Sequence, residues 1–500
     1  MQSNDRIKKL KLSSIFGLTY QVILIISGFI LPKFFLRYYG SSVYGLVSSI
    51  TQFLSFINIC DLGIGAVVSS ALYKPLADDN TNEVSRIYFT AKKYFRVVSY
   101  ILVAYVVILI FVYPNIVANE FDLWFTVSLI LAMCISQFSQ YFLGISYQIL
   151  INADQKSYIQ YIINGLTLLI NTLLCVLLMI NGCNIQLVKL STSIIYLFRP
   201  LLMALYVRKH YKLDKKIKPD FACLPQKSNG IIQHISYMVY ENTDVIVLTC
   251  LSSLANVAIY NIYFLVVNSI KTMINSLTNG FLATFGNIIA KKEMNYLNST
   301  FNTFEWFLHT IGVMLFTITG ILIVPFVLIY TNGIEDANYN VPLFAILIII
   351  AGFMNLIRNG YFTLIKAAGH YKQTQKASLI ETILNVLISV VLVFNYGLVG
   401  VAIGTIVSTV FFVIYETIYL HKNILNRKFT LFLKQCFVDI IIIFLIVLST
   451  SWMTISTTSY GGWIINALEV TGISLVIVAV IEFILNRENI HNFYITFIKK

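Results

Sequence analysis

The chain has 500 residues, of which 58% are hydrophobic and only 11% are charged. A soluble domain carries about 45–50% apolar and about 25% charged residues, so the composition excludes a soluble enzyme, a disordered chain and a secreted disulfide scaffold. The apolar runs are long and unbroken, whereas a membrane β-barrel would show short segments that alternate. A helical membrane protein remains.

Apolar runs long enough to cross a bilayer, which takes about 20 residues, follow one another along the whole chain. In chain order they lie at about 13–36, 43–72, 97–119, 123–150, 158–181, 185–207, 231–252, 257–290, 306–330, 342–365, 378–395, 398–420, 430–450 and 462–485. We therefore predict an all-α polytopic membrane protein with about 14 transmembrane helices.

The basic residues predict the orientation of these helices. Of the 35 Lys and Arg residues, 29 fall in the loops on one side of the predicted spans, and the loops on the other side hold only Arg37. Lys and Arg concentrate in cytoplasmic loops, so we expect both termini to be cytoplasmic. The net charge of +13 then reflects membrane topology, and no nucleic-acid partner is expected.

A basic segment near the middle of the chain, which contains Pro219 and Pro225, is interpreted as a linker. We predict an N-terminal six-helix lobe at 1–210, the cytoplasmic linker at 211–230, a C-terminal six-helix lobe at 231–422, and two additional helices with a tail at 423–500. A weak internal repeat supports two pseudo-symmetric lobes, although chance similarity between apolar helices also explains it.

No cofactor, metal site or catalytic arrangement is expected. The seven cysteines contain no C-x-x-C pair and lie mostly in apolar runs, and no phosphate-binding GxxxxGK[ST] motif is present. The first apolar run is long enough to span and has no cleavage site, so we expect it to be a helix of the mature protein.

Three segments resemble the polysaccharide flippases of the multidrug/oligosaccharidyl-lipid/polysaccharide exporter superfamily. They are Tyr-Gly-Leu at 44–46 followed by Asp-Leu-Gly-Ile-Gly at 61–65, Asn-Thr-Asp-Val-Ile-Val at 242–247 with Val-Ala-Ile-Tyr at 257–260, and Ala-Ala-Gly-His at 367–370 with Gly-Leu-Val-Gly-Val-Ala-Ile-Gly at 397–404. Between the two parts of the third segment stand Glu381 and Asn385.

The resemblance implies a transporter, not an enzyme, in the bacterial cytoplasmic membrane. It would move undecaprenyl-(pyro)phosphate-linked oligosaccharide repeat units from the inner to the outer leaflet by alternating access, with cation coupling. The two six-helix lobes would surround a central cavity. The implied partners are the lipid-linked substrate, membrane lipids, a polysaccharide polymerase and a chain-length regulator. Two rival functions remain, namely a drug or small-metabolite cation antiporter of the same superfamily, and a membrane polysaccharide polymerase or ligase.

Charged residues inside apolar runs are the candidate site, because a charge at mid-bilayer costs a few kcal/mol and usually faces a cavity or a partner. The predicted cavity cations are Lys271, Arg358, Arg199, Lys33 and Arg37. The candidates for coupling-ion binding or charge pairing are Glu241, Asp244, Asp61 and Glu381.

The alternatives to these roles are structural. Lys271 could pair with Glu241 or Asp244 and lock two helices together, and Arg358 could form a buried structural pair. Lys33 and Arg37, near a membrane interface, could instead extend their charged groups into it, as could Lys189. Asp61 could serve helix packing, and Glu381 and Glu416 could pair with lysines of the nearby loops.

Overall fold

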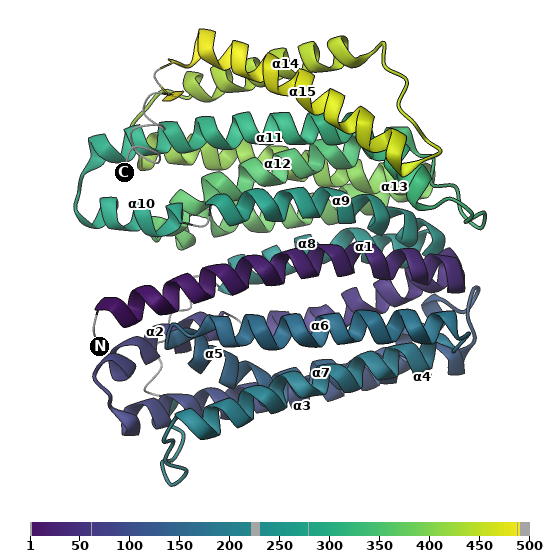
Figure 1. Ribbon diagram of the computed structural model, residues 1–500. Coiled ribbons are helices and arrows are strands. Elements are labelled where there is room, and N and C mark those ends of the chain that lie inside the picture. The colour runs from purple at the N-terminus through teal and green to yellow at the C-terminus, as the bar shows by residue number, and fades with distance from the viewer. Residues whose placement is uncertain (1–2, 62, 222–230, 279, 488, 491–500) are drawn as a thin grey trace. The chain divides into compact units, whose positions relative to one another are not determined.

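The computed structural model describes residues 3–61, 63–221, 231–278, 280–487 and 489–490. These residues form helices and contain no β-strand, which confirms the predicted all-α class (Figure 1). Eleven helices of the described chain are long and apolar enough to cross a membrane. The protein is therefore a multi-pass membrane protein.

The helices divide between two compact units, residues 1–258 (unit 1) and 259–500 (unit 2). Unit 1 holds α1 (Ser3–Ser55), the 3-10 helix η1 (Phe56–Asp61), α2 (Ile64–Ala77), α3 (Thr81–Ile116), α4 (Leu123–Ser139), the π-helix η2 (Gln140–Gly144), α5 (Ile145–Ala153), α6 (Ser157–Ile180), α7 (Ile185–His210), α8 (Ile231–Leu251) and the start of α9 (Leu254–Thr278). Unit 2 holds the rest of α9, α10 (Phe281–Ala290), α11 (Met294–Tyr330), α12 (Pro342–Ala367), α13 (Tyr371–Asn423), α14 (Thr430–Thr450) and α15 (Tyr460–Leu485).

Two helices are too long for a single crossing. Both α1 and α13 run for 53 residues, about 80 Å at 1.5 Å per residue, against a hydrocarbon core of about 30 Å. Each is broken at one glycine: Gly40 has φ 82° and ψ 173°, and Gly397 has φ 50° and ψ −124°. A positive φ is readily adopted only by glycine, so these residues set the two breaks.

The break in α13 folds the helix into an antiparallel hairpin. A Cβ atom at Gly400 would lie 2.5 Å from the Leu392 backbone, and one at Gly404 would lie 2.9 Å from the Ser389 nitrogen. The predicted spans 378–395 and 398–420 are thus the two halves of α13. The helix α8, at the predicted span 231–252, falls outside the eleven apolar helices. The count of 14 crossings therefore stays a prediction.

Helix α8 is fixed within unit 1 by a buried chain of hydroxyl groups. Tyr113 of α3 donates to Ser49 of α1 over 2.8 Å, and Thr249 of α8 donates to the same Ser49 oxygen over 2.8 Å. All three side chains are buried, so each polar group is satisfied by another helix. The division between the units falls after α8, and the lobe boundaries at 210, 230 and 422 stay predictions.

Gly45 permits a close approach of α1 to the start of α9 within unit 1. A Cβ atom at this position would collide with the carbonyl oxygen of Leu254 and lie 2.7 Å from its carbonyl carbon.

We predict that Gly45→Ala destabilises the protein by about 1–3 kcal/mol, because two backbones must move apart. Thermal unfolding in detergent measures this. Gly286→Ala is the control, since nothing lies within 4 Å of that Cβ, and an equal melting temperature for the two variants would contradict the prediction.

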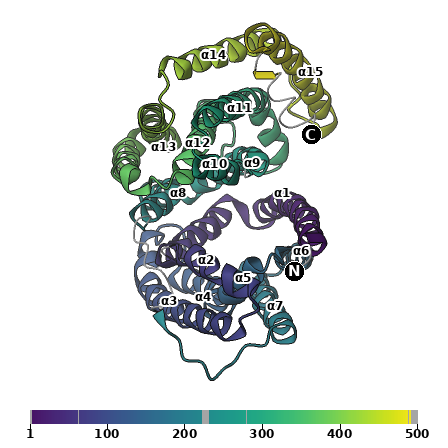
Figure 2. The same ribbon diagram turned by 90° about the vertical axis from the view of Figure 1, so that its left-hand side faces the viewer.

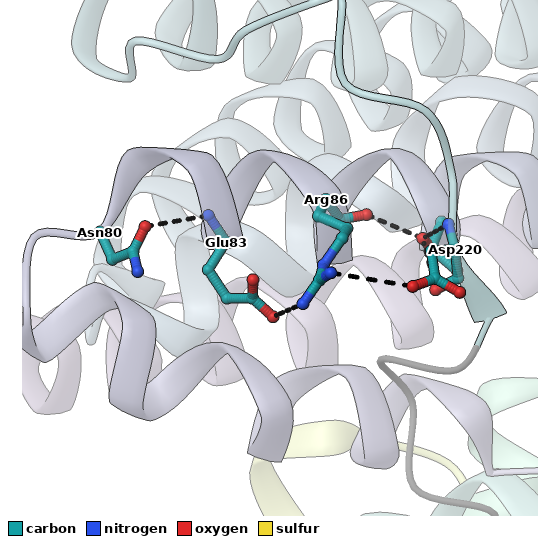
Figure 3. Close-up of polar contacts among 5 residues, drawn as sticks. Asn80, Glu83, Arg86 and Asp220 are labelled. Atoms are coloured by element: carbon teal, nitrogen blue, oxygen red, sulfur yellow. Dashed lines mark hydrogen bonds and ion pairs between the residues drawn. The ribbon is translucent and has the colours of Figure 1, made fainter.

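The segment that follows α7 is held along α3. The Asp220 backbone N–H donates to the Thr90 hydroxyl over 2.9 Å, and its carboxylate lies 3.8 Å from Arg86. Figure 3 shows Arg86 between Asp220 and Glu83, which lies 2.8 Å from it, while Asn80 caps the helix at the Glu83 backbone. The predicted linker is therefore anchored to unit 1 as far as it is described; residues 222–230 lie outside the described residues.

Tyr211 anchors the beginning of the same segment. Its hydroxyl donates to Oδ2 of Asp154 over 2.6 Å, and the Lys156 ammonium lies 2.6 Å from the same oxygen. Burial, and then the hydrogen bond to Asp154, raise the pKa of the Tyr211 hydroxyl, so this tyrosine stays neutral and keeps donating.

In unit 2 the two C-terminal helices pack against α11 (Figure 2). The Trp306 indole nitrogen and the Thr310 hydroxyl of α11 donate to the Glu482 carboxylate of α15 over 2.5 and 2.8 Å. His309 of α11 lies 2.6 Å from Asp439 of α14. Both carboxylates are buried, so α14 and α15 are attached to unit 2 by specific polar contacts as well as by apolar packing.

Candidate functional site

Unit 1 contains a polar cavity of about 490 Å³. It is enclosed by α1, α4, η2, α5, α6 and α7. Its lining includes the amides Gln137, Gln140, Gln148, Asn164 and Asn171, the hydroxyls Thr51, Ser136, Thr192, Ser193 and Tyr196, and the cations Lys189 and Arg199. A cavity with this many hydrogen-bonding groups inside an apolar bundle suits a polar ligand rather than lipid chains.

A π-helix shapes one wall of this cavity. The η2 segment replaces the regular helix between α4 and α5, and such single-turn insertions occur frequently at functional sites. Within it Gln140 donates to Gln148 over 3.1 Å. Gly144 leaves the space for this amide, because a Cβ atom there would lie 2.5 Å from the Gln140 side-chain oxygen.

The two cations in the cavity lack acidic partners. Arg199 donates through Nε to the Thr167 hydroxyl over 2.8 Å and stacks 3.7 Å from the centre of the Tyr196 ring. The Lys189 ammonium lies 4.3 Å from the centre of the Phe35 ring. Within the described part of the chain no carboxylate pairs with either cation, and the lining contains none. The cavity is electropositive and fits an anionic group with polar substituents.

The other predicted cations of unit 1 lie outside this lining. Lys33 is half-buried and Arg37 is exposed, both on the first half of α1 before the break at Gly40. Arg199 is thus the predicted cation that the structure places in the cavity, together with Lys189. Substrate contact by any of them stays a proposal.

Asp61 lies at the end of η1, where the chain turns at Gly63 into α2. Both oxygens of its carboxylate lie 3.8 Å from the position of a Cβ at Gly65, which is ordinary van der Waals contact. Nearby, His234 of α8 contacts the Asn58 carbonyl over 3.2 Å. Asp61 therefore stands at a break between helices, which leaves both of its predicted roles open.

Arg358 and Glu381 form a buried pair in unit 2. Two contacts join them, Nε to Oε1 at 2.7 Å and Nη2 to Oε2 at 2.8 Å. The exposed fractions are 3% for Arg358 and 0% for Glu381. Arg358 thus forms the buried structural pair that was the alternative to substrate contact. Contact with a substrate would require this pair to open.

The remaining candidates belong to different units. Glu241 and Asp244 lie on α8 in unit 1, where Asp244 is buried. Lys271 lies on α9 in unit 2, half-buried, with its ammonium 5.8 Å from the centre of the Phe264 ring. Pairing between Lys271 and these carboxylates stays a prediction.

Unit 2 also contains an apolar groove of about 560 Å³ between α11, α12 and α14. Its lining is aliphatic and aromatic apart from a few polar groups such as Thr317 and the His309–Asp439 pair. Ile346 and Ile440, which belong to that lining, are 54% and 62% exposed on the surface of the described chain. In a membrane such side chains face lipid, so the groove is accessible to an acyl or polyprenyl chain.

No protein-family model and no curated protein sequence matches the chain. Solved structures match its fold. "Lipid II flippase MurJ, inward closed conformation" has a TM-score of 0.65 at 15% identity and covers 96% of this chain and 99% of that chain. An inward-facing multidrug MATE transporter of the MOP superfamily has a TM-score of 0.57 at 12% identity, covering 82% of this chain and 98% of that chain. A eukaryotic MATE transporter has a TM-score of 0.56 at 11% identity, covering 83% and 96%.

The chain shares its fold with these transporter structures. The resemblance inferred from the sequence segments is thereby confirmed at the level of the fold. The MATE structures leave nearly a fifth of this chain unmatched, whereas the MurJ structure leaves 4%, fewer residues than α14 and α15 contain. Most of the two C-terminal helices is therefore included in the MurJ-like part of the fold.

Several residues of the cavity could not be predicted from the sequence. Gln140 and Gln148 depend on a π-helix that leaves no pattern in the residues. Lys189 was interpreted as interfacial, whereas the structure places it in the cavity, ten residues before Arg199 on α7. The Arg358–Glu381 pair had a usable signal, because both residues lie about three helical turns from the turn at Gly369.

Proposed function

We propose that this protein is a flippase that moves undecaprenyl-(pyro)phosphate-linked oligosaccharide repeat units from the inner to the outer leaflet of the bacterial cytoplasmic membrane. Both termini would be cytoplasmic, and the product would serve capsule, O-antigen or exopolysaccharide synthesis. The observation that carries the proposal is the polar cavity in unit 1 with two cations and no carboxylate in its lining.

The chemistry of that cavity fits the head of such a substrate. A pyrophosphate-linked sugar is anionic and rich in hydroxyl groups, and its transfer through hydrocarbon without partners is costly. Arg199 and Lys189 would offset the negative charge, and the amides and hydroxyls would replace water around the sugar. The Tyr196 ring, already stacked on Arg199, holds the guanidinium in place.

The apolar groove in unit 2 fits the other part of the substrate. A polyprenyl chain is an uncharged hydrocarbon, and the groove offers an aliphatic and aromatic lining with a lipid-accessible rim. One wall of the groove is formed by α14, the first of the two C-terminal helices. A lipid-linked substrate explains why the chain has both a polar cavity and an apolar groove.

The rival functions fit less well. A cation antiporter would have to admit positively charged compounds, which two cations in the cavity would repel. A polymerase or ligase needs space for chemistry outside the membrane. The loops opposite the basic side, such as the segment between α11 and α12, are at most about a dozen residues long.

The test is export of a surface glycan in a strain that lacks the gene. The intact gene should restore the glycan, and its loss should leave lipid-linked repeat units accumulated on the cytoplasmic leaflet. Unchanged glycan in the deletion strain, or restored drug resistance without any glycan effect, would contradict the proposal. Resistance profiling of an overexpressing strain separates the antiporter from the flippase.

A further inference from the structure

The interior of the α13 hairpin holds buried polar residues that the cavity of unit 1 does not involve. On the first half of α13, Glu381, Asn385 and Ser389 follow one another at intervals of four residues, and all three are 0% exposed. Asn385 donates to Thr405 of the second half over 3.1 Å. Residues four apart share one helix face, so these three residues form a polar face that contacts the second half of the hairpin.

Glu416, on the second half of α13, is the least satisfied member of this interior. Its exposed fraction is 0%, and within the described chain neither carboxylate oxygen accepts a hydrogen bond. An ionised carboxylate in such a place would lose its hydration without gaining a donor, which costs several kcal/mol. The same carboxyl group carries little of that cost when it holds a proton.

The charges around Glu416 do not compensate it. Helix α12, the helix that packs extensively against α13, contributes Arg358 and Lys366, and the first half of α13 contributes Glu381. Arg358 is engaged by both oxygens of Glu381, so that pair is neutral as a whole. Lys366 is exposed, and its ammonium lies 4.3 Å from the centre of the Phe362 ring.

Arg358 is placed so that it could serve either carboxylate. Its guanidinium lies 4.9 Å from the centre of the Phe412 ring, and Phe412 precedes Glu416 by one helical turn on the same face. Arg358 therefore lies beside the helix face that carries Glu416, while its donors engage Glu381.

We propose that Glu416 is a proton-binding site and that its protonation sets the position of Arg358. This inference rests on the proposed function, since it supplies the coupling ion for transport. With the proton on a Glu416 oxygen, Arg358 pairs with Glu381, as the structure has it. When that O–H bond breaks and the proton leaves to water, the new carboxylate attracts Arg358, and α12 and the two halves of α13 move together. No other bond forms or breaks.

Infrared difference spectroscopy of the full-length protein in lipid tests the site without any substrate. A protonated buried carboxyl group gives a C=O stretching band that an ionised one lacks. We expect this band at neutral pH and expect it to disappear on titration to alkaline pH. Glu416→Gln should remove it, while Glu416→Asp should keep a band at a shifted frequency. Glu335→Gln, on an exposed loop, is the control and should leave the band unchanged.

A band that persists in Glu416→Gln would overturn the proposal, as would a titration that follows the sodium concentration instead of pH. Glu416→Asp keeps the test valid if Glu416→Gln does not fold. Failure of the flippase proposal gives a different pattern, in which the carboxyl band titrates as expected but glycan export never depends on the gene. If both proposals hold, export by Glu416→Gln should lose its sensitivity to a protonophore, while export by Glu335→Gln should keep it.

Discussion

Replacing Arg358 with leucine is expected to destabilise the protein by about 3–5 kcal/mol, because it leaves the Glu381 carboxylate buried without its partner. Native proteins are stable by only about 5–15 kcal/mol, so the apparent melting temperature in detergent should fall by many degrees. Loss of the Phe412 contact adds to the effect. Thermal unfolding followed by tryptophan fluorescence measures it.

The double variant Arg358→Leu/Glu381→Leu separates a lost partner from lost packing. Replacing both members of a buried pair by apolar groups is often close to neutral, so the double variant should recover most of the stability. Lys422→Leu, an exposed cation at the end of α13, is the matched control and should have little effect. A double variant as unstable as Arg358→Leu alone would contradict this account of the pair.

The predicted spans agree with the helices wherever the apolar run has clear boundaries. The run at 158–181 became α6, and 430–450 became α14, because burial in lipid requires the backbone to hydrogen-bond within the helix. Helix α8 follows the predicted span as well, although it carries Glu241 and Asp244. Its partners Ser49 and Tyr113 explain how a less apolar helix is accommodated.

The breaks at Gly40 and Gly397 fall where the predicted spans separate, between 36 and 43 and between 395 and 398, but the sequence does not show which glycine makes a break. Glycine is common in membrane helices, and hydropathy does not distinguish a glycine that packs closely, such as Gly404, from one that turns the chain, such as Gly397. The difference lies in the backbone angles. These depend on contacts made by the whole hairpin.

Side-chain contacts between residues far apart in the chain could not be predicted from the sequence either. His309 and Asp439 are separated by 130 residues, and Trp306 and Glu482 by 176, so a single sequence gives no reason to join them. The sequence marked Glu381 and Arg358 separately as charges that lipid would not tolerate. The two residues lie at similar distances from the turn between α12 and α13. In an antiparallel helix pair such residues lie side by side, so their spacing could have predicted the pair.

Replacing Arg199 with glutamine is expected to reduce glycan export about 10- to 150-fold with little change in the amount of protein. A hydrogen bond to a charged group contributes about 1.5–3 kcal/mol, and glutamine keeps a donor towards Thr167 but loses the charge. The stability should change little, because Arg199 has no buried carboxylate partner among the described residues whose loss would be costly. Lys189→Gln should act in the same direction, since both cations line one cavity.

Arg208→Gln is the matched control, because it makes the same substitution on the same helix at an exposed position outside the cavity. Export should be normal in this variant. If Arg199→Gln and Lys189→Gln both export normally at normal protein levels, the cavity of unit 1 does not bind the anionic head of the substrate. If Arg208→Gln lowers export as much as Arg199→Gln, the effect follows the net charge of α7 and not the cavity. The proposal requires the loss to be confined to the two cations that the cavity encloses, since only there does an anion exchange water for a fixed positive charge.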